Sequence, residues 1–207
     1  MVRRFAPFLV PSTLPALAAM LLIAACSPLG VAVGAGATAG IAASEERGIE
    51  GTVRDTAIRA EISKLWLDQS LEFYKALEMQ IYEGRVLLTG RVPTRDMADT
   101  AVRLAWQPAG VREVINEIIV DDGDLTDLAS DALAAGKLRT ELTFTRDVQA
   151  INYSVRVIDG IVYVIGVAQD EAELDRVIRT ARAMSGVRGI VNHVLMKDDP
   201  RRSGGSP

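Results

Sequence analysis

Few residues in this sequence have the chemistry of a nucleophile or a metal ligand. Cys26 is the only cysteine and His193 the only histidine, which disfavours a Cys/His zinc site, a disulfide framework and a Cys–His dyad. Acidic pairs such as Asp170 and Glu171 lie where helices are expected to start, and there they favour the helix dipole. Residues 34–40 are rich in glycine but miss the spacing of a dinucleotide-binding loop by one position. We therefore expect no catalytic residue, no metal site and no cofactor.

Cys26 follows a segment that predicts export. Arg3 and Arg4 precede an apolar run, as in a secretory signal peptide, which we place at residues 1–25. Prolines interrupt the run, whereas a membrane-spanning helix needs about 20 apolar residues in succession. Residues 23–26, Ile-Ala-Ala-Cys, resemble the lipobox of bacterial lipoproteins. That resemblance implies that Cys26 receives acyl chains after cleavage. The alternative is an ordinary signal peptide that contains a cysteine.

The residues after Cys26 predict where such a lipoprotein resides. Ser27 is not aspartate, and by resemblance to Gram-negative lipoproteins this implies transport to the outer membrane, facing the periplasm. Residues 26–44 comprise the lipidated cysteine and an uncharged stretch rich in glycine and alanine, which we interpret as a tether. Removal of residues 1–25 changes the formal net charge from −4 to −6. Nucleic acid is therefore not expected as a partner.

The rest of the chain contains an internal repeat. Residues 84–120 align with residues 160–196 without a gap, and ten of these 37 positions are identical. Upstream, the same offset pairs Asp55 with Asp131, so the repeat extends to about 54–120 and 130–196. Self-similarity of this kind predicts two homologous units.

Each unit is expected to fold through the same five elements. A helical stripe comes first, and an acidic-glycine pair, Glu83-Gly84 or Asp159-Gly160, then predicts a hairpin between two strands. A second helix and a final alternating strand follow. The order α-β-β-α-β predicts an α+β fold with a three-stranded mixed sheet packed against two helices. The chain thus divides into a signal peptide at 1–25, a tether at 26–44, a first domain at 45–120, a linker at 121–129, a second domain at 130–197 and a disordered tail at 198–207.

A spaced set of residues occurs in both units and resembles the BON domain. In the first unit the set is Asp55, Ile58, Ile62, Gly84, Val86, Gly90, Gly110, Val111, Val114 and Asn116. In the second unit it returns as Gly160, Val162, Gly166, Gly186, Val187, Ile190 and Asn192. With the lipobox and the tether, the tandem pair resembles the dual-BON outer-membrane lipoproteins of Gram-negative bacteria. This resemblance implies anionic phospholipid binding and a role in envelope integrity, without catalysis.

The same resemblance places the phospholipid contact on the first helix of the second domain. That helix begins in the family at an acidic residue matching Asp131, and an aromatic residue follows two positions later, where this sequence has Leu133. Lys137 and Arg139 match a basic-apolar-basic stretch of the family. The resemblance therefore assigns phospholipid binding to Leu133, Lys137 and Arg139.

Helical geometry gives independent support to part of this assignment. At about 100° per residue, Ala134, Leu138 and Leu142 face the core, while Leu133, Lys137 and Thr140 lie on the opposite side. An outward leucine beside an outward lysine suits a surface that enters the membrane interface and pairs with phosphate. The alternative is that both are ordinary surface or interdomain residues.

We therefore expect a non-enzymatic, lipid-anchored periplasmic protein whose partner is the membrane. The alternative is an adaptor whose BON domains bind envelope or division proteins while the acyl chains serve only as a tether. An enzyme or a stress chaperone would need a motif that this sequence does not offer.

Overall fold

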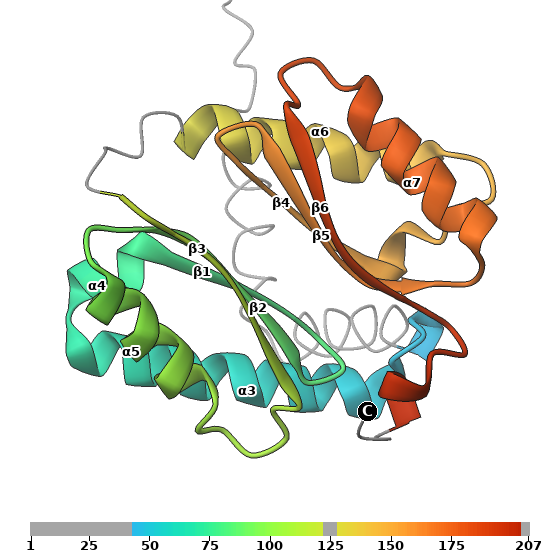
Figure 1. Cartoon of the computed structure of the whole chain (residues 1–207). Coiled ribbons are helices and arrows are strands. Elements are labelled where there is room, and N and C mark those ends of the chain that lie inside the picture. The colour runs from blue at the N-terminus through green and yellow to red at the C-terminus, as the bar shows by residue number, and fades with distance from the viewer. Residues whose placement is uncertain (1–42, 122–127, 204–207) are drawn as a thin grey trace, which may run out of the picture. The chain divides into compact units, whose positions relative to one another are not determined.

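The computed structural model describes residues 43–121 and 128–203, all within one compact unit (Figure 1). The expected signal peptide, Cys26 and nearly all of the tether lie outside the described residues, as does most of the linker. Within the described part of the chain, no helix is both long enough and apolar enough to cross a bilayer.

The first repeat contains three helices and three strands. In chain order these are α3 (Gly48–Gln69), α4 (Leu71–Ala76), β1 (Leu77–Tyr82), β2 (Arg85–Val92), α5 (Arg95–Ala105) and β3 (Glu113–Val120). The sheet order is β1-β2-β3, with β1 antiparallel and β3 parallel to β2. The predicted mixed three-stranded sheet is confirmed.

The second repeat has the same sheet. Its elements are α6 (Leu128–Phe144), the 3-10 helix η1 (Ala150–Asn152), β4 (Tyr153–Ile158), β5 (Ile161–Ala168), α7 (Glu171–Ala183), β6 (Gly189–Met196) and the 3-10 helix η2 (Pro200–Ser203). The order is β4-β5-β6, again antiparallel and then parallel. In Figure 1, α3 and α5 cover one face of the first sheet, and α6 and α7 cover one face of the second.

Local chemistry explains where these elements begin and turn. Thr94 and Asp170 cap α5 and α7, because each side chain accepts a hydrogen bond from the backbone N–H three residues later. Both hairpins turn through two residues with positive φ, as the acidic-glycine pairs predicted: φ is 53° at Glu83 and 73° at Gly84 in the first repeat.

Each repeat has its own core between helices and sheet. In the first, Ile58, Ile62 and Trp66 of α3 pack against Val86 and Leu88 of β2. In the second, the equivalent core contains Leu138 and Leu142 of α6 and Val162 and Val164 of β5. These stripes and alternations are the ones that the sequence pattern predicts.

A third apolar cluster joins the two repeats through the other faces of their sheets. Leu87 of β2 alternates with Val86 and Leu88, and it belongs to the same cluster as Tyr163 and Ile165 of β5. Successive side chains of a strand point to opposite faces, so each sheet is covered by helices on one face and by the other repeat on its second face. The two BON-like repeats therefore share a buried interface.

Two features differ from the sequence-based expectation. Helix α4 was not predicted; Ser70 caps it by accepting from the Phe73 backbone N–H, and Phe73 packs edge-on against Trp66 with ring centroids 6.4 Å apart. The tail was expected to be disordered from residue 198, but Pro200–Ser203 forms a 3-10 helix. Arg202 explains this order, since its guanidinium donates to both carboxylate oxygens of Glu83.

Candidate functional site

The surface predicted to contact phospholipid is built on α6. Ala135, Leu138 and Leu142 are buried against the sheet of the second repeat, and Ala134, also expected to face the core, is half-buried beside them. The core stripe thus fixes which side of α6 faces outward. Leu133, Lys137 and Thr140 are exposed, as helical spacing predicts.

Leu133 and Lys137 lie together in a groove between α6 and α7. The groove has a volume of about 970 Å³, and its other side is formed by Thr180 and Ala183 of α7 and by Met184, which directly follows that helix. Leu133 is 68% exposed, a high value for a leucine. An apolar side chain one turn from a lysine, beside a groove with a methionine wall, can place acyl surface and phosphate together.

Arg139 is exposed but does not line this groove. It is two residues from Lys137, a rotation of about 200° on a helix, so the two cations leave α6 in different directions. The structure therefore brings together Leu133 and Lys137 and leaves Arg139 on another side of the helix.

Phe144 is a residue of this face that the sequence reasoning missed. It ends α6 and is 82% exposed. It lies eleven residues, or about three turns, after Leu133, so the two side chains share a stripe on the helix. The same spacing argument that selected Lys137 would have found it. The face thus has an aromatic residue, though at the opposite end of α6 from Leu133.

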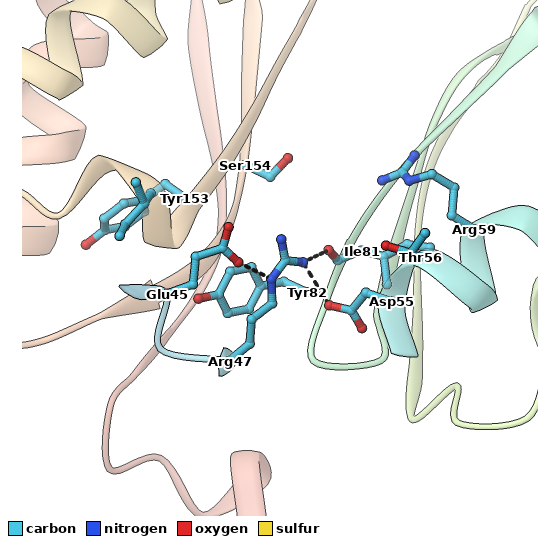
Figure 2. Close-up of a pocket in the computed structure, with 10 residues that line it drawn as sticks. Glu45, Arg47, Asp55, Thr56, Arg59, Ile81, Tyr82, Tyr153 and Ser154 are labelled. Atoms are coloured by element: carbon cyan, nitrogen blue, oxygen red, sulfur yellow. Dashed lines mark hydrogen bonds and ion pairs between the residues drawn. The ribbon is translucent and has the colours of Figure 1, made fainter. Parts of the chain in front are cut away.

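A second, polar pocket of about 270 Å³ lies between α3, β1 and the start of β4 (Figure 2). Dashed lines in Figure 2 join Arg47 to Glu45, Asp55 and the Ile81 carbonyl. Arg47 also stacks on the Tyr82 ring, with its guanidinium carbon 4.9 Å from the ring centroid. Arg47 is therefore satisfied by the protein itself.

Asp55 in this pocket is a structural residue. Its carboxylate accepts from the backbone N–H groups of Glu83 and Gly84, at 2.9 and 2.8 Å, and from Arg47 at 2.9 Å. Burial raises the pKa of the Tyr82 phenol nearby, which stays protonated. The groups of this polar pocket thus hold a hairpin turn in place and are not arranged as a nucleophile and a base.

His193 lies at the interface of the repeats. Its Nε2 is 2.9 Å from a carboxylate oxygen of Glu117, and its backbone carbonyl accepts from Arg85 at 2.8 Å. Among residues 43–121 and 128–203, no group of three or more His, Cys, Asp or Glu side chains could hold a metal ion.

Comparison with known proteins agrees with this architecture. The model of the BON domain family matches residues 54–122 and 130–198. The chain is 28% identical over 162 residues to "Outer membrane lipoprotein DolP" of Haemophilus influenzae, covering 77% of this chain and 83% of that protein. It is 25% identical over 146 residues to "Osmotically-inducible protein Y" of Escherichia coli, covering 69% and 73%.

A third relative matches over nearly its whole length. This protein of Anaplasma centrale, named "Uncharacterized protein in gshII 5'region", is 32% identical over 152 residues, which cover 72% of this chain and 99% of that protein. The two segments matched by the family model make up more than half of the chain, and each contains one of the observed mixed sheets with its helices. The chain therefore belongs to the BON domain family, as a protein with two BON domains.

Proposed function

We propose that this protein is a non-catalytic, lipid-anchored protein of the outer membrane that faces the periplasm and binds anionic phospholipid through its second BON domain. The observation that carries the proposal is the exposed Leu133 beside Lys137 on the groove between α6 and α7. The name of the relative "Outer membrane lipoprotein DolP" supports the location. Envelope integrity is the role that this binding would serve.

Two attachments act together in the proposed mechanism. Acyl chains on Cys26 hold the chain at one leaflet, so that α6 meets headgroups at high effective concentration. Leu133 enters the interface, and Lys137 pairs with phosphate. Because the chain without residues 1–25 has a formal net charge of −6, binding depends on this small face and is weak without the anchor.

Vesicle flotation tests the α6 surface. A chain beginning at residue 43 lacks the anchor and is mixed with phosphatidylglycerol or phosphatidylcholine vesicles. We expect binding to the anionic vesicles alone, weakened about fivefold by Lys137→Gln, since one lysine near an anionic surface contributes about 1 kcal/mol. Lys64→Gln is the matched control, because Lys64 is an exposed lysine of α3 that pairs with Asp68. Absence of binding by the unaltered chain would instead favour the adaptor function.

The anchor has its own test. Cys26→Ala should leave unprocessed precursor, which membrane fractionation and the electrophoretic mobility of the chain would reveal. Normal processing and retention of this variant in the membrane would count against lipidation.

A further inference from the structure

A pocket in the first BON domain gathers positive charge that the protein does not neutralise. It lies between α3, α4 and β1 and has a volume of about 370 Å³, within the range of about 300–1,000 Å³ that small ligands occupy. Its polar lining includes Arg59, Ser63, Trp66, Tyr74 and Lys75. It is separate from the groove on α6, which belongs to the other repeat.

Arg59 is held at this pocket without a carboxylate of its own. One guanidinium nitrogen donates to the Met79 carbonyl at 2.9 Å, and this is its only hydrogen bond among the described residues. Figure 2 shows that, among the residues drawn there, Asp55 is joined to Arg47 and not to Arg59. Burial, together with repulsion from Arg47, lowers the pKa of Arg59. An anion that approaches Arg59 can accept charge-assisted hydrogen bonds from the guanidinium.

Lys75 brings a second positive charge to the same pocket. It forms no ion pair or hydrogen bond within the part of the chain that the structure describes, and it is exposed. Glu78 also lines the pocket, but its carboxylate pairs with Arg156 of β4. The acidic residue of the pocket lining is therefore already paired, and the pocket keeps an excess of positive charge.

Trp66 supplies an independent sign of a missing acceptor. The side chain is fully buried, and its indole Nε1–H has no hydrogen-bond partner among the described residues. A buried donor without an acceptor is rare in folded proteins and calls for a specific explanation. Trp66 is part of the wall of this pocket, so a group that enters the pocket lies against a residue whose buried donor has no acceptor.

The pocket is peculiar to the first repeat. At the offset of 76 residues that relates the repeats, Arg59, Trp66 and Lys75 correspond to Ala135, Leu142 and Ile151. Helix α4, which carries Tyr74 and Lys75, has only the short η1 near the corresponding place. The shared fold therefore does not require these groups, and their joint presence in one repeat needs another reason.

We propose that this pocket binds a phosphate group, with Arg59 and Lys75 as the cationic ligands and Tyr74 and Ser63 as hydroxyl donors. The phosphate is that of a phospholipid headgroup or of a free phosphate compound. Leu71 precedes Lys75 by one turn of α4 and is 56% exposed, so an acyl chain would find an apolar surface beside the pocket.

Phosphate titration followed through Trp66 tests this site. The full chain, labelled with ¹⁵N and held in a maltoside detergent that contains no phosphate, is titrated with inorganic phosphate and with dihexanoyl phosphatidylglycerol. Trp106→Phe assigns the two indole N–H resonances. We expect a saturable shift of the Trp66 resonance and, for Lys75→Gln, an increase in Kd of about tenfold or more from the lost charge-assisted contact.

Lys64→Gln, which removes an exposed α3 lysine already paired with Asp68, is the matched control and should leave Kd unchanged. Arg59→Gln is the second variant, read together with the backbone spectrum because Arg59 also supports β1. A lower Kd for dihexanoyl phosphatidylglycerol than for inorganic phosphate, with the difference lost in Leu71→Ser, supports a phospholipid headgroup as the ligand. Equal Kd values for the two compounds support a free phosphate compound. A stationary Trp66 resonance at saturating phosphate, or equal weakening by Lys64→Gln, overturns the proposal. Lys137→Gln should not alter this titration, so its outcome is separate from that of the α6 surface.

Discussion

Asp55 and Asp131 occupy the same position in the two repeats, and each holds the hairpin turn of its own sheet. Asp55 accepts two backbone hydrogen bonds of 2.8 and 2.9 Å and pairs with Arg47. Asp131 accepts one of 2.8 Å and a longer one of 3.5 Å. The acidic residue that helped to define the repeat in the sequence therefore has a structural role in each domain.

Replacement of these two aspartates should cost different amounts of stability. We expect Asp55→Ala to lower the free energy of unfolding by about 3 kcal/mol, because it leaves the backbone N–H groups of Glu83 and Gly84 without an acceptor and removes the ion pair with Arg47. Asp131→Ala should cost about 1 kcal/mol. Urea denaturation measures both. Asp99→Ala is the control, since Asp99 is also identical in the two repeats but exposed; equal effects of all three would contradict this explanation.

Residue-level reasoning from the sequence succeeded where helical spacing was used. Spacing placed Leu133 and Lys137 together on the outer side of α6, and the structure has them in one groove. Arg139 was assigned to the same surface because it matches a basic-apolar-basic stretch of the family. Residues two apart in such a stretch are not neighbours on the surface of a helix. The sequence did not predict the proposed phosphate pocket. Arg59 and Lys75 line one pocket only because α4, a helix that was not predicted, packs beside α3.

At the scale of elements, Gly90 of β2 determines how closely the start of β1 can approach. Its φ is 129°, and a Cβ there would lie 2.3 Å from the Ala76 carbonyl oxygen. We expect Gly90→Ala to lower the free energy of unfolding by about 3 kcal/mol. Gly136 lies within α6 and a Cβ there meets nothing within 4 Å, so Gly136→Ala should stabilise by about 0.5–1 kcal/mol. Thermal unfolding compares the two; a loss of stability in Gly136→Ala would contradict the argument.

The sequence predicted the elements that recur in both repeats and missed the ones that do not. Alternation and turn residues repeat with the fold, so each copy supports the other. Helix α4 has six residues and depends on Phe73 packing against Trp66, a tertiary contact that local pattern does not reveal. The order at Pro200–Ser203 likewise depends on Glu83, more than a hundred residues earlier.

At the scale of the whole described unit, the amino-acid pattern of β5 indicates that the two repeats pack together. Residues Ile161–Ala168 form an apolar run rather than an alternating one, which is typical of a strand covered on both faces. Val162 and Val164 face α6 and α7, while Tyr163 and Ile165 join the cluster shared with the first repeat. Two homologous sheets, each with one face under its own helices, thus pack into one compact unit through their other faces.

Because the two repeats share this cluster, we expect them to unfold together, and a substitution in the cluster should separate their unfolding transitions. Both tryptophans, Trp66 and Trp106, lie in the first repeat, so tryptophan fluorescence reports that repeat while far-ultraviolet circular dichroism reports both. In the unaltered chain the two urea transitions should coincide. Ile165→Asp places a charge in the shared cluster, which opens the interface because the charge cannot remain buried unpaired, and the two transitions should then separate.

Val164→Ala is the matched control on the same strand. Val164 faces the core of the second repeat, so Val164→Ala should lower the free energy of unfolding by about 1–2.5 kcal/mol and with it the urea midpoint. The interface between the repeats stays intact in this variant, so the fluorescence and circular dichroism transitions should still coincide. Transitions that already differ in the unaltered chain, or that still coincide in Ile165→Asp, would mean that the buried contact between the sheets contributes little free energy. The two BON domains would then behave as independent folding units.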